Sequence, residues 1–141
     1  MILVDSSVWI EAGRRNGKLE YKVGLENLLD AYEAIWCGPV KLEVLGAARI
    51  QERKILETYF SIIPYKPMED SAWEFAKNCY QKLRDQGHTL PFNDVLLGSL
   101  SLTWECRVYA QDQHFEVMRD VIGVRLYTPG YGGKYEHDIG G

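Results

Sequence analysis

The chain alternates short apolar runs with longer segments of helical periodicity, and this alternation constrains the fold more than any other feature. The opening run Ile-Leu-Val at residues 2–4 predicts a buried strand, because it is apolar on both faces. Four further strands are predicted at AIWCG, Phe60 to Pro64, RVYAQ and VRLYT. Strands separated by helices are typical of an α/β domain with a parallel sheet. We therefore expect a single three-layer α/β/α domain with a parallel sheet of about five strands.

The segments between these strands are predicted to be helices. Apolar residues predict a long helix from Val40 to about Phe60. Ser71 and Glu74 have the spacing of a capping box at the start of another helix. Asn93 is predicted as the N-cap of the helix that precedes RVYAQ.

Composition places the chain among ordinary globular proteins. At 141 residues one domain is expected, over residues 1–130, followed by a flexible, glycine-rich tail over residues 131–141. The three cysteines form no CxxC pair, which favours buried free thiols in a cytoplasmic protein. We expect no membrane association. The net charge of -4 argues against a general nucleic-acid coat, but an enzyme that holds acids around a cation stays compatible with it.

Four acids occupy positions at which strands and helices meet. Asp5 follows the first strand, and Glu43 lies in the first turn of the helix after the second. Asp94 begins the helix before the fourth strand, and Asp112 follows that strand. Singly, each acid is explained by helix capping or by the helix dipole. Together, at the carboxyl edge of a parallel sheet, they would repel one another unless a divalent cation neutralised them. Oxygen-only ligands, without cysteine or histidine, point to Mg²⁺ or Mn²⁺.

Four stretches of the chain resemble a known family. ILVDSSVWIE, GPVKLEVLGAAR, GHTLPFNDVLLGSLSL and VYAQDQHFEVM resemble the PIN domain, and more narrowly the VapC-type toxins of bacterial and archaeal toxin–antitoxin pairs. The resemblance covers about Met1 to Thr128. It implies a PIN-like fold and a metal-dependent endoribonuclease that cuts tRNA or rRNA. It also implies a small antitoxin protein as partner and a homodimer.

The resemblance assigns the catalytic and metal-binding residues to the four acids, Asp5, Glu43, Asp94 and Asp112. In the resulting hypothesis of phosphodiester hydrolysis, the three aspartates hold the cation, and the glutamate completes the site or orients the attacking water. Many relatives carry a further acid where this chain has His114, and Ser or Thr where it has Ala110. We expect His114 to pack or to face solvent rather than to bind metal.

Two groups of side chains could assist the acids. Ser6 and Asn93 are candidates for orienting the carboxylates, although helix capping also explains both. Five cations are candidates for contacting RNA phosphates, namely Arg14, Arg15, Lys41, Arg49 and Arg53. The alternative for this group is a solvated charged face.

Three other functions compete with the nuclease. A catalytically silent PIN-fold module would bind RNA or protein, but it would have no reason to keep four mutually repelling acids. A phosphatase or receiver-like domain would offer an acid pair beside Asp5 and a lysine in VRLYTPG, and neither is present. A DNA-directed nuclease of the same fold would usually be longer.

Overall fold

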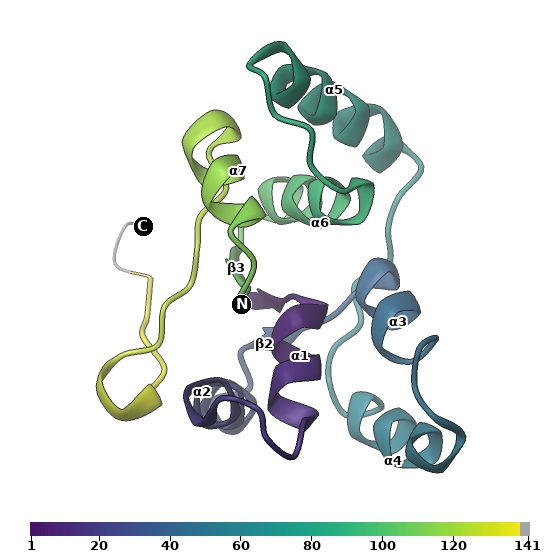
Figure 1. Ribbon diagram of the computed structural model, residues 1–141, viewed down its shortest axis with the longest axis vertical. Coiled ribbons are helices and arrows are strands. Elements are labelled where there is room, and N and C mark those ends of the chain that lie inside the picture. Colours follow the sequence, from purple (N-terminus) through teal and green to yellow (C-terminus); the bar gives the residue numbers. More distant parts are fainter. Residues whose placement is uncertain (139–141) are drawn as a thin grey trace.

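A parallel sheet lies at the centre of the protein. The computed structural model describes residues 1–138, and Figure 1 shows the arrangement of its elements. The strands β1 (Ile2–Val4), β2 (Ala34–Ile35) and β3 (Arg107–Tyr109) are ordered β2-β1-β3, and both pairings are parallel. Leu3 of β1 pairs with Ile35 on one side and with Val108 on the other. All three residues of β1 are buried, which explains why its sequence is apolar without alternation.

Helices cover the sheet in two groups. The helices are α1 (Ser6–Gly13), α2 (Leu19–Asp30), α3 (Gly38–Val44), α4 (Ile50–Phe60), α5 (Ser71–Asp85), α6 (Phe92–Thr103) and α7 (His114–Ile122). Helix α1 packs on α2 and α3, whereas α5, α6 and α7 pack on one another. In Figure 1 the first group lies in the lower part of the molecule and the second in the upper part, with the strands between them. The predicted α/β class and layered arrangement are confirmed.

Among residues 1–138 the sheet has three strands, and two single bridges lie beside them. Tyr65 bridges Trp36, and Leu126 bridges Val108, both in the parallel sense. The strand predicted from Phe60 to Pro64 is wrong, because α4 ends at Phe60, a turn follows at residues 61–63, and the bridge lies one residue beyond the predicted range, at Tyr65. The ring of Phe60 is buried against Trp9 and Trp36, so tertiary packing determines this segment.

The long helix predicted from Val40 to Phe60 is also wrong, because the chain forms α3 and α4 with a break between them. At Gly46 the backbone approaches the carbonyl of Leu42 so closely that a Cβ atom would collide with it. Arg49 is the N-cap of α4, and its guanidinium contacts Glu52 at 2.6 Å. Arg49 and Arg53 therefore belong to α4 and not to the helix that carries Glu43.

Two helix starts differ from the predicted ones. The capping box of Ser71 and Glu74 does not form, since Asp70 occupies the N-cap position and Glu74 pairs with Lys77 at 2.5 Å. Asn93 lies inside α6, whose N-cap position is Pro91. The side chain of Asn93 is therefore free to reach a partner outside its own helix.

The core surrounds β1 and is apolar. Leu28, Leu97, Phe115 and Met118 are among its fully buried residues, and the three cysteines are buried and free, as predicted. Within the described part of the chain, no helix is long and apolar enough to cross a membrane.

The segment after α7 returns along α2 and includes the short 3-10 helix η1 (Tyr131–Gly133). Asn27 of α2 donates a hydrogen bond to the carbonyl of Gly133 at 2.9 Å, and Arg107 donates one to the carbonyl of Glu136 at 2.8 Å. The predicted domain boundary at residue 130 and the flexibility of the tail stay predictions, and residues 139–141 lie outside the described residues.

Candidate active site

Asp5 is held rigidly at the carboxyl edge of the sheet. Its backbone N–H donates to the carbonyl of Tyr109 at 2.9 Å, which continues the pairing of β1 with β3. Its carboxylate caps α1 by accepting a hydrogen bond from the N–H of Ser7 at 3.0 Å. The residue is only 4% exposed. Asp5 therefore caps α1 and also lies at the carboxyl edge of the sheet, as predicted.

Burial changes the acidity of Asp5. Desolvation raises its pKa from 3.8 to about 6, although the hydrogen bonds from Ser7 oppose this rise. The negative charges of Asp94 and Glu43 raise the pKa further. These charges come from α6 and α3, so acids that are distant in sequence act on one another here.

Glu43 lies in the last turn of α3 and not in the first turn, where it was predicted, because α3 already ends at Val44. Donors from two other elements fix its carboxylate. Ser6 at the start of α1 donates from its hydroxyl to Oε2 of Glu43 at 2.9 Å, and Asn93 of α6 donates from its amide to Oε1. Both candidates for orienting a carboxylate thus contact the same glutamate. The alternative that Asn93 caps its helix is wrong, because no side-chain cap hydrogen bond is made at the start of α6.

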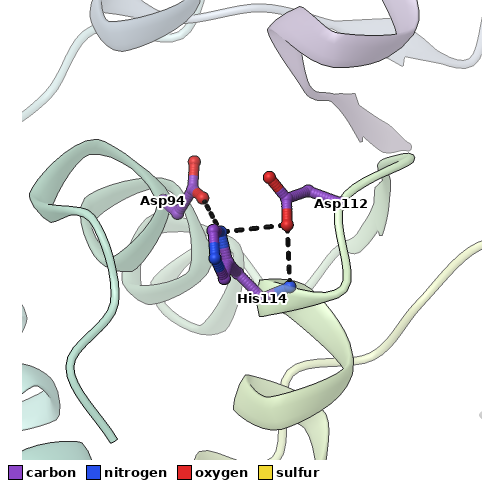
Figure 2. Close-up of side chains that lie close together, drawn as sticks. All are labelled: Asp94, Asp112 and His114. Atoms are coloured by element: carbon purple, nitrogen blue, oxygen red, sulfur yellow. Dashed lines mark hydrogen bonds and ion pairs between the residues drawn. The ribbon is translucent and has the colours of Figure 1, made fainter.

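Asp94, Asp112 and His114 form a compact cluster, shown in Figure 2. Nδ1 of His114 lies 2.7 Å from Oδ2 of Asp94 and 2.9 Å from Oδ1 of Asp112. The backbone N–H of His114 also donates to Oδ1 of Asp112, at 3.0 Å. Burial is the main cause that raises the pKa of Asp94, the hydrogen bond from His114 lowers it, and the charge of Asp112 raises it.

The donor set of this cluster fits a divalent cation. One ligand atom from each of its three residues can be chosen so that all lie within 4.8 Å of one another. Asp5 and Glu43 lie outside that group but interact electrostatically with Asp94. Among residues 1–138, no lysine or arginine forms an ion pair with any of the four acids. A cation would therefore relieve the repulsion between these carboxylates.

Three of the five candidate cations for RNA contact line a groove beside Glu43. Arg14, Arg15 and Arg49 surround this groove of about 520 Å³ between α1, α3 and α4. Arg14 is paired with Glu11 at 3.4 Å.

The other two candidates lie outside this groove. Lys41 stands over the ring of Tyr65, with 5.8 Å between its Nζ and the ring centroid. Arg53 donates to the carbonyl of Ala48 at 3.1 Å. A larger cavity of about 630 Å³, between α2 and the C-terminal segment, contains none of the four acids.

His114 is the site residue that sequence reasoning missed. We expected its side chain to pack or to face solvent, but its ring contacts two of the acids. The signal available in the sequence was its position two residues after Asp112, at the start of a helix, where the ring turns back toward that carboxylate.

The fold and the site together define a class of protein, that of α/β domains with an acidic cluster at the carboxyl edge of a parallel sheet. No protein-family model matches the chain. It is 28% identical over 130 residues to VapC ribonuclease Mb1587 of Mycobacterium bovis and, to the same extent, to ribonuclease VapC11 of Mycobacterium tuberculosis. Each alignment covers 89% of this chain and 96% of the relative.

Solved structures with low sequence identity share the fold. VapBC2 from Rickettsia felis, bound to a promoter DNA fragment, matches with a TM-score of 0.73 and 14% identity over 90% of this chain and 98% of that one. FitAcB from Neisseria gonorrhoeae matches with a TM-score of 0.71 and 13% identity over 91% and 97%. The predicted resemblance to VapC-type PIN-domain proteins is confirmed by these similarities.

Proposed function

We propose that this chain is a metal-dependent endoribonuclease that hydrolyses phosphodiester bonds in RNA, and that it is the toxin of a type II toxin–antitoxin pair. The observation that carries the proposal is the meeting of Asp5, Glu43, Asp94 and Asp112 at one edge of the sheet. Curated relatives named VapC ribonucleases, matched over most of the chain, support RNA as the substrate. A tRNA or an rRNA is the target class that we propose.

In this proposal Asp94, Asp112 and Asp5 hold Mg²⁺ or Mn²⁺, as their hard oxygen ligands favour. Such a cation supplies Lewis-acid stabilisation of the phosphate and makes water a stronger acid. Hydrogen bonds from the backbone hold two of the carboxylates in place. Asp5 is fixed by the end of β1, and Asp112 by the N–H of His114, so neither has to be ordered when RNA arrives.

Glu43 is the residue that we propose orients the attacking water. Hydrogen bonds from Ser6 and Asn93 leave each of its oxygens with a further lone pair. Because the two donors come from α1 and α6, they fix the plane of the carboxylate relative to the aspartates. A water bound to Glu43 would then be held in one orientation before the reaction begins.

The groove beside Glu43 is the place at which we propose that the RNA backbone binds. Arg14, Arg15 and Arg49 would contact its phosphates and offset the repulsion between the RNA and a chain of net charge -4. Among described residues, Arg15 forms no ion pair, whereas Arg14 and Arg49 do. The guanidinium of Arg15 can therefore bind a phosphate without first breaking an existing ion pair.

A small antitoxin protein is the proposed partner, because the structural neighbours include a toxin–antitoxin complex from Klebsiella pneumoniae and VapBC2 from Rickettsia felis. A homodimer is proposed on the family resemblance alone. Co-purification of the chain with the product of a neighbouring short reading frame would test the first proposal, and light scattering would test the second.

The catalytic proposal is tested by incubating the purified protein with total tRNA and with structured rRNA fragments. Reactions contain Mg²⁺, Mn²⁺ or EDTA, and the ends of the products are mapped by sequencing. The proposal predicts discrete cuts that require the metal. A folded protein that binds these RNAs without cutting them would instead identify a catalytically silent RNA-binding module.

A further inference from the structure

His114 occupies a position between two of the proposed metal-binding carboxylates. Asp94 reaches its ring from α6, and Asp112 reaches it from the loop after β3, as Figure 2 shows. Both carboxylates are directed at the same ring atom, Nδ1, at 2.7 and 2.9 Å. We propose that His114 binds the cation of this site through Nδ1 and biases the site toward Mn²⁺ over Mg²⁺. This inference rests on the proposed function.

The spacing of the three donor atoms supports this role. Two ligands at adjacent corners of an octahedron lie about 3.0 Å apart when each is about 2.1 Å from the metal. The separations from Nδ1 to the two carboxylate oxygens are already close to this value. Small movements of the side chains would therefore open a position for a cation between the three donors.

A purely structural role would not require this arrangement. The backbone N–H of His114 already orients Asp112 through a hydrogen bond of 3.0 Å, so the ring is not needed for that purpose. A single N–H at Nδ1 can be directed well at only one of the two carboxylates. A metal ion, in contrast, accepts both carboxylates and the lone pair of the neutral ring at the same time.

The imidazole changes which cation the site prefers. Mg²⁺ is a hard cation that favours oxygen ligands, whereas nitrogen ligands add more to the affinity of first-row transition metals. Replacing His114 by aspartate would restore an all-oxygen site of the kind that the family resemblance implies. The preference for Mn²⁺ should then fall.

The test uses Mn²⁺ alone as the probe, with the full chain and without RNA. Pulsed electron paramagnetic resonance detects nitrogen coupled to bound Mn²⁺, and calorimetric titration gives the dissociation constants for Mn²⁺ and Mg²⁺. We expect nitrogen coupling in the wild type and in a His88→Gln control, whose imidazole lies in the loop after α5. We expect no coupling in His114→Asp, with the ratio of Mn²⁺ to Mg²⁺ affinity lowered by about tenfold or more.

Mn²⁺ bound to the wild type without nitrogen coupling would overturn the inference, and so would coupling that persists in His114→Asp. Failure to bind Mn²⁺ at all would overturn it too. Circular dichroism melting verifies that each variant is folded. RNA cleavage by the same preparations separates the two proposals. Metal-dependent cutting without nitrogen coupling refutes only the role of His114, whereas coupling without cutting refutes the nuclease and leaves His114 as a ligand.

Discussion

Asp5→Asn should make the metal-free protein more stable at alkaline pH. Burial raises the pKa of Asp5 in the folded protein to about 6, above its ordinary value of 3.8. Protonated Asp5 therefore favours the folded state below pH 3.8, and this advantage is lost as the pH rises through about 6. A difference of one unit between the folded and unfolded pKa corresponds to 1.36 kcal/mol, so the rise from 3.8 to about 6 corresponds to about 3 kcal/mol of folding free energy. Asparagine carries no charge at any of these pH values and is an equally good N-cap.

The measurement is urea unfolding in EDTA, followed by circular dichroism, between about pH 4 and about pH 8. The free energy of unfolding of Asp5→Asn, taken relative to the wild type, should rise by about 2.5 kcal/mol across this range, because part of the full difference is already lost at pH 4. Using the change with pH removes any constant effect of packing the amide. Asp85→Asn, an exposed substitution at the end of α5, is the matched control and should follow the wild type. A difference between Asp5→Asn and the wild type that does not vary with pH would refute the reasoning.

The same pair of proteins reports on metal binding. A ligand that binds only the folded state at a hundred times its dissociation constant stabilises that state by about 2.7 kcal/mol. Saturating Mn²⁺ should therefore stabilise the wild type at about pH 8 and have a smaller effect on Asp5→Asn. Equal stabilisation of both proteins would show that Asp5 is not part of the metal site.

Three further predictions concern other parts of the structure. Ser6→Ala and Asn93→Ala each remove one donor to the glutamate of the site, so single-turnover RNA cleavage should fall about 10–100-fold while the melting temperature changes little. Arg15→Ala should weaken RNA binding and reduce its salt dependence by about one phosphate contact. Arg84→Ala, on the remote helix α5, should leave both the affinity and the salt dependence unchanged. Fluorescence anisotropy at several salt concentrations measures both quantities. Trp36→Phe leaves a buried backbone carbonyl without its 3.0 Å hydrogen bond and should cost about 1–3 kcal/mol in urea unfolding.

The sequence predicted the structure best at the centre of the sheet, where the apolar pattern of a segment matches its burial. The apolar run before Asp5 predicted β1, and the positions of Asp5 and Asp112 after two strands predicted that both would lie at the same edge of a parallel sheet. Both predictions follow from geometry that parallel sheets impose on any sequence.

Other features depend on contacts that no local pattern records. The break between α3 and α4 is set by the close approach of Gly46 to a backbone carbonyl, and Phe60 stays helical because tryptophans distant in sequence bury it. Asn93 was predicted as a cap because asparagine favours that position, but a glutamate from α3 attracts its side chain instead. The contacts of His114 required knowing how α7 leaves the sheet.

The central claim is that the acids at the sheet edge form one site for RNA cleavage. The most direct test is the rate of metal-dependent cleavage by Asp94→Asn, compared with wild type and with Asp85→Asn. All three proteins are first verified as folded by circular dichroism. Loss of discrete cutting in Asp94→Asn alone is the predicted result. Cutting that persists at the wild-type rate in Asp94→Asn would contradict the assignment of the site.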